Sequence, residues 1–214
     1  MRILIDDFVQ DSDAPDELKS PALADDYEFT TSIVIDLGSP KTIDCIGIGN
    51  TDGINFTVNG QAVTFSENGL YLLSPSITAQ NITINYDGSF VGRIGLGINR
   101  NICTIPAKEP GFYSTFQDRD TVSGQVVPGA GGIWGRKIGV DVRYKITEEI
   151  YSDFTSAYPS QISKNFPFFL NFLEEDFKLP FKLFYASLNN NDLTFQNAIN
   201  KFLYSKRFDF IERF

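Results

Sequence analysis

The residues Asn55-Phe56-Thr57-Val58-Asn59-Gly60-Gln61-Ala62-Val63-Thr64-Phe65 carry the clearest structural signal in the chain. Apolar and polar side chains alternate on both sides of Asn59-Gly60, as they do in half-buried strands. Asparagine and glycine both tolerate a positive φ, which a two-residue type I′ turn requires. The stretch therefore predicts a β-hairpin, and it makes β-structure the first expectation for the sequence around it.

Strand patterns continue on both sides of this hairpin. Upstream, residues 32–37 alternate and are followed by Gly38-Ser39-Pro40, so we expect that strand to break there and a second one to start at Thr42. Downstream, residues 82–86 and 91–98 flank Asp87-Gly88 and predict a second hairpin-like pair. Turn signals recur about every ten residues, which favours a β-sandwich or jelly roll.

The segment before these strands is strongly acidic. Residues 6–28 contain nine acidic side chains, and we expect a surface loop there after one short strand. Calcium prefers such oxygen ligands, but the segment contains no twelve-residue calcium-binding loop pattern. We therefore interpret it as a solvated acidic surface and expect no metal or other cofactor.

The second half of the chain predicts a β-rich α+β arrangement. Residues 137–146 alternate over ten positions and predict a long strand. Thr147 is placed to cap a helix that starts with Glu148-Glu149 and ends near Tyr158-Pro159. The remaining expected elements are strands at 168–173, 181–186 and 204–212, a helix or turn at 193–200, and a glycine-rich loop at 124–135.

Charge and aromatic content divide the chain unevenly. Residues 1–100 hold 14 acidic and 5 basic side chains, whereas residues 101–214 hold 13 of each. Only 5 of the 20 phenylalanines lie in the first 100 residues. A composition shift of this kind indicates two domains. We expect a β-sandwich at 1–100, a linker with the glycine-rich loop at 101–136 and an aromatic-rich assembly domain at 137–214.

The composition argues against several classes of function. The net charge of −9 disfavours binding to nucleic acid, because that binding depends on cations at phosphates. The chain has no histidine, so the usual triads and most zinc or iron sites are excluded. The loop at 128–137 lacks the Gly-Lys-Ser/Thr ending of a phosphate-binding loop and is followed by a strand. Adjacent carboxylates at 148–149 and 174–176 do not define glycosidase spacing. We do not expect an enzyme.

The sequence also bears on the compartment. Asp6-Asp7 follows the short apolar start at once, so no signal peptide is expected, and no apolar run is long enough for membrane insertion. Folding in a cytoplasm then favours reduced thiols, and a Cys45–Cys103 disulfide is disfavoured.

Two groups of residues are candidates for contacts. Asn50, Thr51 and Asp52 have hydrogen-bonding side chains that suit a sugar ligand, although an ordinary turn explains them equally well. A protein interface is the second candidate, because aromatic side chains in loops are often contact residues. Its members are Phe112, Tyr113, Phe116, Trp134 and Arg136. We expect the four aromatic residues in or near loops, and most other phenylalanines in the core.

The pattern resembles a group of tailed-bacteriophage tail and tail-tip proteins with an N-terminal discoidin-like (galactose-binding-like) β-sandwich. The N-terminal residues that carry the resemblance are 31–38, 43–50, 55–60 and the closing Ile94-Gly95-Leu96-Gly97. In the second domain they are Gly135-Arg136-Lys137, the long alternating strand, the glutamate-rich helix start and Phe208-Asp209-Phe210-Ile211-Glu212. The resemblance covers most of the chain and is one of pattern.

The resemblance implies a structural protein of the virion, assembled in the host cytoplasm. It implies a tail, tail-tip or neck component in symmetric copies, with other virion proteins as partners, a homo-oligomeric ring and a contact with host-surface glycan. The alternative is a free carbohydrate- or surface-binding β-sandwich module, which should carry a signal peptide and disulfides when secreted. An enzyme is the third hypothesis.

Overall fold

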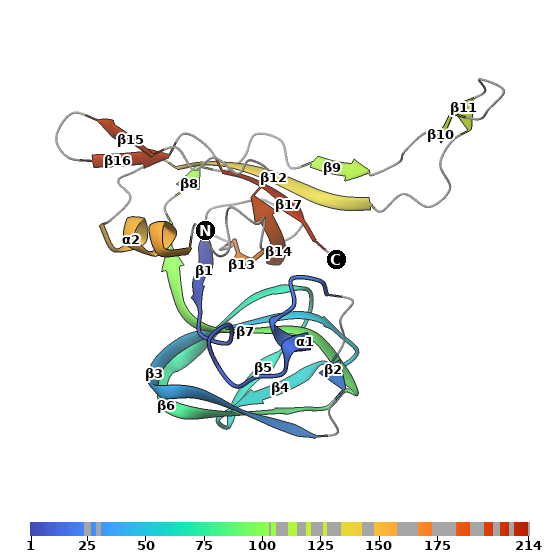
Figure 1. Cartoon of the computed structure of the whole chain (residues 1–214), viewed down its shortest axis with the longest axis vertical. Coiled ribbons are helices and arrows are strands. Elements are labelled where there is room, and N and C mark those ends of the chain that lie inside the picture. The colour runs from blue at the N-terminus through green and yellow to red at the C-terminus, as the bar shows by residue number, and fades with distance from the viewer. Residues whose placement is uncertain are drawn as a thin grey trace.

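The structure is a computed structural model of the whole chain. It describes residues 1–23, 27–28, 31–102, 104–105, 111–114, 119–120, 126–127, 134–142, 148–157, 167–172, 183–188, 195–198, 202–205 and 208–213. Within these residues the fold is mainly β, with a curled antiparallel sheet and two short helices (Figure 1), which confirms the expected fold class.

The first half supplies the curled part of the sheet. Its elements are β1 (Arg2–Asp7), α1 (Asp16–Lys19), β2 (Tyr27–Glu28), β3 (Ser32–Thr51), β4 (Asn55–Val58), β5 (Gln61–Thr64), β6 (Gly69–Tyr86) and β7 (Phe90–Asn101). The second half supplies β8 (Thr104–Ile105), β9 (Gly111–Ser114), β10 (Arg119–Asp120), β11 (Val126–Val127), β12 (Trp134–Val142), α2 (Glu148–Ala157), β13 (Phe168–Asn171), β14 (Leu183–Leu188), β15 (Phe195–Ala198), β16 (Phe202–Ser205) and β17 (Phe208–Glu212).

Described strands from both halves belong to one hydrogen-bonded sheet. Its order is β5-β4-β6-β3-β7-β1-β13-β14-β17-β12-β8, and β2 and β9 pair beside it with β7 and β12. The N-terminal strand β1 lies between β7 and β13, so it connects the strands of residues 1–100 to those of the second half. The division into domains at 100 and 136 stays a prediction.

The hairpin at Asn59-Gly60 is confirmed. Asn59 and Gly60 have φ values of 47° and 85°, as a type I′ turn requires. β4 and β5 pair around them, with Val58 opposite Gln61 and Phe56 opposite Val63. This register agrees with the two-residue turn expected from the sequence.

The expected strand break at Gly38-Ser39-Pro40 is wrong. Gly38-Ser39-Pro40 does not end a strand, because β3 continues to Thr51 and its pairing with β6 only shifts between Asp36 and Lys41. Gly38 has φ 74° and donates its backbone N–H to Asp36 Oδ1 at 2.8 Å. These turn-forming residues therefore produce an irregularity inside one long strand and do not end it.

The strands around Asp87-Gly88 also differ from the expected hairpin-like pair. β6 and β7 do not pair with each other, because β3 lies between them. The turn at 87–89 therefore passes across β3 rather than joining neighbouring strands. A turn signal in the sequence predicts that the chain reverses direction, but it does not predict which strands become neighbours in the sheet.

The acidic N-terminal segment is more buried than a surface loop. Val9, Ala14 and Leu18 are 4% exposed or less and belong to the main hydrophobic cluster of the curled sheet. The acidic side chains between them face outward, with Asp11 and Asp13 exposed. The expectation of a surface loop is corrected: a few apolar residues at irregular spacing anchor the segment and its helix α1 on the core.

The second half agrees with most of the expected elements. The helix is confirmed as α2 (Glu148–Ala157), while its expected cap Thr147 lies outside the described residues. The expected helix or turn at 193–200 is instead the strand β15, which pairs with β16. The expected final strand is described as two strands, β16 and β17, in different sheets. No helix among the described residues is long and apolar enough to cross a membrane.

Candidate functional site

The residues expected to bind a ligand lie where β3 ends, and their polar groups have partners inside the chain. Asn50 has φ 49°, its backbone N–H donates to Asn68 Oδ1 at 2.8 Å, and its side-chain amide donates to the carbonyl of Leu23 at 2.7 Å. The Thr51 hydroxyl contacts the Tyr86 hydroxyl and lies 2.9 Å from the carbonyl of Phe90. Both side chains therefore connect separate segments of the sheet.

Asp52 joins its own loop to the turn at 87–90. Its carboxylate accepts hydrogen bonds from Ser89 N (2.9 Å), Ser89 Oγ (2.6 Å) and Phe90 N (3.2 Å), and the Tyr86 hydroxyl lies 2.5 Å from Asp52 Oδ1. The hydrogen bonds from Ser89 and Tyr86 hold the pKa of Asp52 well below its usual range. We call Thr51, Asp52, Tyr86 and Ser89 the Asp52 cluster.

A second carboxylate, Asp87 in the turn at 87–89, joins this turn to the loop that follows Asp52. Asp87 accepts hydrogen bonds from Ile54 N and Asn55 N, both at 2.9 Å, and from Asn55 Nδ2 at 2.6 Å. The backbone and side-chain N–H groups of Asn55 lower the pKa of Asp87. A ligand at Asn50–Asp52 would have to compete with these internal bonds, and the sugar contact there stays a prediction.

Three of the expected interface aromatics lie in strands rather than loops. Phe112 and Tyr113 belong to β9 and Trp134 begins β12, with Tyr113 opposite Gly135 and Phe112 opposite Arg136. Phe112 and Tyr113, expected in or near loops, lie within a strand because β9 pairs with β12, while Trp134 is the first residue of its strand. Phe116 lies outside the described residues.

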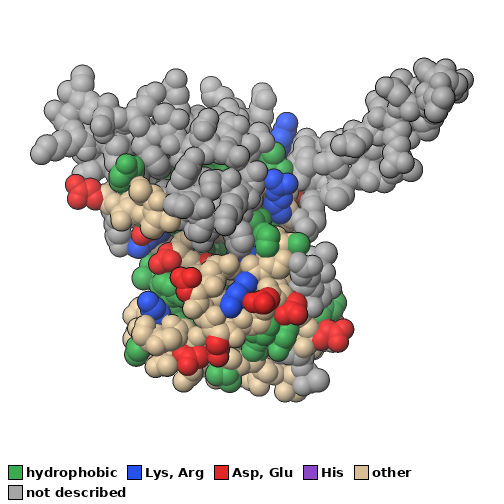
Figure 2. All heavy atoms as spheres, viewed as in Figure 1, with side chains coloured by type: hydrophobic (Ala, Val, Ile, Leu, Met, Phe, Trp, Pro, Cys, Tyr) green, Lys and Arg blue, Asp and Glu red, His purple; other side chains and the backbone are tan. Residues whose placement is uncertain are grey.

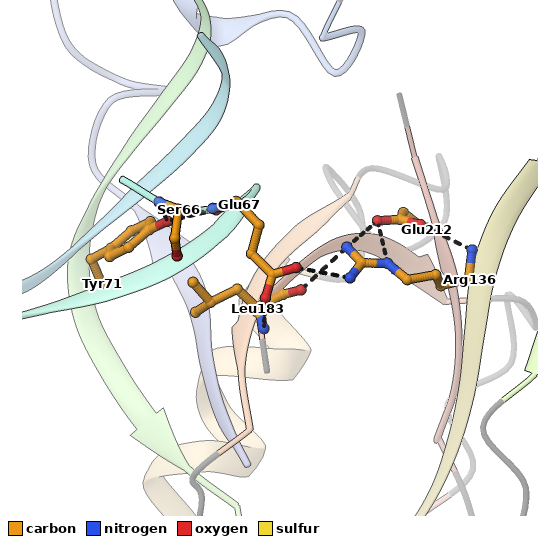
Figure 3. A network of polar contacts seen from close by, with 6 residues as sticks. All are labelled: Ser66, Glu67, Tyr71, Arg136, Leu183 and Glu212. Carbon is orange, nitrogen blue, oxygen red and sulfur yellow. Dashed lines mark hydrogen bonds and ion pairs between the residues drawn. The ribbon is translucent and has the colours of Figure 1, made fainter. Parts of the chain in front are cut away.

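Arg136 points into the chain and binds two carboxylates. Its backbone N–H and its Nε donate to Glu212 at 2.9 and 2.8 Å, and Nη2 contacts the same carboxylate. Its Nη1 donates to Glu67 Oε2 at 2.9 Å (Figure 3). The Arg136 side chain is 20% exposed, Glu67 33% and Glu212 5%. Arg136, Glu67 and Glu212 form what we call the Arg136 network.

Glu67 brings the curled part of the sheet into this network. It follows β5, and Tyr71 in β6 holds its backbone: the Tyr71 hydroxyl donates to the Glu67 carbonyl at 2.6 Å and accepts from Ser66 N and Glu67 N (Figure 3). Glu67 Oε1 also accepts the backbone N–H of Leu183 at 3.2 Å. The network therefore joins β12, β14 and β17 to the turn between β5 and β6.

Arg93 and Asp7 form a buried ion pair that was not predicted from the sequence. Arg93 Nη2 lies 3.1 Å from Asp7 Oδ2, and the two side chains are 2% and 6% exposed. Asp7 also accepts Val9 N at 3.1 Å and Leu96 N at 3.0 Å, while Arg93 donates to the carbonyls of Lys19 and Ser20. Desolvation raises the pKa of Asp7, and Arg93 opposes that effect. The available signal was one arginine inside an apolar strand.

Two aromatic rings of the second half cover this ion pair. The Arg93 guanidinium lies 5.8 Å from the ring centre of Phe169 and 5.7 Å from that of Tyr185. The Tyr185 hydroxyl donates to the carbonyl of Pro21 at 3.0 Å, and burial raises its pKa. Cation–π contacts of this kind hold an arginine against aromatic faces. Asp7, Arg93, Phe169 and Tyr185 form the Arg93 cluster.

Glycines in the curled sheet make room for Phe169. Gly47 in β3 and Gly95 in β7 are register partners. A Cβ at Gly47 would overlap the Phe169 ring, and a Cβ at Gly95 would lie 3.0 Å from it. The ring therefore rests directly on the backbone of two paired strands.

The Asp52 cluster, the Arg136 network and the Arg93 cluster all hold distant parts of the chain together. Each joins segments that are distant in the sequence, and each of their carboxylates accepts several hydrogen bonds or an ion pair. Within the described ranges, no group of three or more Cys, Asp or Glu side chains is placed to hold a metal ion. Comparison of the chain with protein families, curated proteins and solved structures found no match.

Proposed function

We propose that this chain is a structural protein of a tailed-bacteriophage virion: a tail, tail-tip or neck component that assembles in symmetric copies. The virion is its proposed location, and other virion proteins and further copies of the chain are its partners. The sequence resemblance motivates the choice of virion. An assembly role is supported by the position of β10 and β11, by the internal ion pairs and by the acidic surface of the curled sheet.

The observation that carries the proposal is the position of β10 and β11. Among the described strands, β10 and β11 pair only with each other, Arg119 with Val127 and Asp120 with Val126, in a sheet separate from the main one. Figure 1 draws them beyond the end of β9 and β12, away from the curled sheet. An isolated two-stranded pair is at best marginally stable in water, so contact with a second chain would stabilise it.

The internal clusters are consistent with a scaffold. The Arg93 cluster and the Arg136 network fix β12, β13, β14 and β17 on the curled sheet through buried or half-buried charges. A component of a symmetric assembly needs a defined geometry between its interaction surfaces, and such contacts supply it.

The surface charge indicates which neighbours fit. Figure 2 shows Asp and Glu side chains distributed over the visible face of the curled sheet, with few Lys or Arg side chains among them. This agrees with the charge of residues 1–100, where acidic side chains outnumber basic ones by 14 to 5. A basic protein surface is the complementary partner, whereas nucleic acid would be repelled.

Quantitative mass spectrometry of purified phage particles from the source of this sequence tests the proposal. We expect the chain in a fixed ratio to the major capsid protein, and that ratio gives its copy number. Absence from particles, together with abundance in the infected cell, would overturn the proposal. Retention of the free chain on a glycan column would then favour the binding-module alternative.

A further inference from the structure

The described residues contain four places where asparagine or aspartate precedes glycine: Asn59-Gly60, Asn68-Gly69, Asp52-Gly53 and Asp87-Gly88. Such pairs are prone to cyclise, because glycine has no Cβ to obstruct attack by its backbone nitrogen on the preceding side chain. We propose that Asn59 is a site of spontaneous deamidation in the folded chain, and that the fold protects the other three positions.

The reaction needs only water. The backbone nitrogen of Gly60 attacks Cγ of Asn59, a C–N bond forms, and the bond from Cγ to the side-chain nitrogen breaks. Ammonia leaves with the proton that Gly60 N loses, and a five-membered imide remains. Water then adds to one of the two imide carbonyls, which gives aspartate or isoaspartate at position 59.

The turn exposes the reacting groups. Asn59 and Gly60 are both exposed, and a Cβ at Gly60 would meet no atom within 4 Å. Within the described part of the chain, the Gly60 N–H makes no hydrogen bond. The nucleophilic nitrogen therefore has no internal partner to give up, and water can reach the imide.

The neighbouring strand polarises the group that is attacked. Asn59 Oδ1 accepts the backbone N–H of Thr83 at 2.7 Å. A fixed N–H at this oxygen stabilises the negative charge that develops on it when Cγ is attacked. The same residue anchors the turn, since Asn59 N donates to the Thr83 carbonyl at 2.8 Å.

Asn68 has the same dipeptide in a different environment. Its side chain is half-buried and accepts Asn50 N at 2.8 Å, while Gly69 is buried at the start of β6. Ring closure at this position would displace the first residue of a strand that pairs with Ile48. The identical dipeptide therefore serves as an internal control.

The two aspartates are protected in another way. The Gly53 N–H donates to the Tyr86 hydroxyl at 2.9 Å, and a Cβ at Gly88 would overlap the Tyr86 hydroxyl and Asp52 Oδ1. Both carboxylates accept several hydrogen bonds that keep them charged. A charged carboxylate is a poor electrophile, so its neighbouring amide does not attack it readily.

The two products have different effects on the hairpin. Aspartate at 59 keeps an oxygen that accepts the Thr83 N–H. Isoaspartate inserts a methylene into the main chain, so the two-residue turn cannot keep both bonds to Thr83. We expect isoaspartate to loosen β5, the strand at one edge of the sheet.

Peptide mapping with isoaspartate quantitation on the full purified chain, aged in mildly alkaline buffer, tests the proposal. We expect conversion at Asn59 to be at least ~10-fold faster than at Asn68. The denatured chain, aged in parallel, should convert both at similar rates because only folding distinguishes them. Equal native rates, or no conversion at Asn59 while the denatured chain converts, would overturn it.

Two variants check the assignment without peptide mapping. Acidic species that accumulate on anion exchange should be absent from aged Asn59→Asp protein, because the reactive amide has gone. They should persist in aged Asn68→Asp protein. The reverse pattern would assign the modification to position 68 and contradict the proposal. The outcome does not depend on whether the chain is a virion protein.

Discussion

The ring of Phe169 in β13 occupies the space in which a side chain at Gly47 in β3 would lie. This contact joins a strand of the second half to the middle of the curled sheet. Gly95, the register partner of Gly47, allows the same close approach from β7. The association of the two halves therefore depends on the absence of side chains at two positions.

Gly47→Ala tests this packing. The added Cβ overlaps a buried ring, so we expect a loss of about 1–3 kcal/mol in the free energy of unfolding. Urea denaturation measures it. Ser32→Ala, at an exposed position of the same strand, should change stability by less than about 0.5 kcal/mol. A Gly47→Ala/Phe169→Leu double variant should lose less than the two single losses together, and simple additivity would contradict the overlap.

Arg93→Met tests the buried ion pair. It leaves Asp7 buried without its cation, so we expect a loss of about 3–5 kcal/mol in the free energy of unfolding. Adding Asp7→Asn should restore part of that loss, because the unpaired charge is then removed. Lys137→Met, at an exposed position of β12, is the control and should be near neutral. An Arg93→Met protein as stable as this control would show that the pair does not matter.

Asp6 makes stability depend on pH. Asp6 is exposed at its surface, but partial desolvation raises its pKa; repulsion by Asp153 and Asp11 adds to the effect, while Lys41 and Arg100 oppose it. A raised folded-state pKa means that its stabilising contribution is present at low pH and is lost as the pH rises through that pKa. Asp6→Asn should therefore stabilise the chain at neutral pH by roughly 0.5 kcal/mol.

This difference should vanish below about pH 3, where Asp6 is protonated in the unfolded chain as well. Urea denaturation of both proteins across this pH range measures it. If Asp6→Asn were instead less stable than the parent chain at neutral pH, the charged form of Asp6 would stabilise the folded chain and the prediction would be contradicted.

The Arg136 network should respond unequally to loss of its two carboxylates. Glu212 is 5% exposed and Glu67 33%. We expect Glu212→Gln to cost about 2–3 kcal/mol and Glu67→Gln less than about 1 kcal/mol, because solvent screens the more exposed pair. Glu17→Gln, at an exposed position of α1, should be neutral. Equal costs for positions 67 and 212 would contradict this order.

The Asp52 cluster gives a prediction about local motion. Asp52→Ala removes the acceptor of both Ser89 groups and of Phe90 N. We expect faster hydrogen exchange at Ser89 and Phe90, with the distant β13–β14 pair unchanged. Because its pKa is lowered in the folded chain, the contribution of Asp52 should be present near neutral pH and lost as the pH falls. Unchanged exchange at Ser89 would show that Asp52 does not brace the turn.

Prediction from the sequence was accurate where short-range chemistry is decisive. The Asn59-Gly60 turn set the β4–β5 register, and two acidic residues marked the start of α2. It was less accurate for the candidate site. Arg136 was expected at an interface, but the structure places its side chain on two carboxylates from distant segments, and nothing in the local pattern reveals them. Its interface role stays a prediction.

Sequence patterns by themselves determined the mainly-β class, the hairpin at Asn59-Gly60 and helix α2, because each depends on residues within one turn or one strand. Only the tertiary structure decided that β3 separates β6 from β7, that β1 joins both halves, and that Arg93 and Asp7 meet under Phe169. Strand order and charge burial depend on contacts between residues far apart in the chain. A periodic pattern specifies which face of a strand is buried but not what covers it.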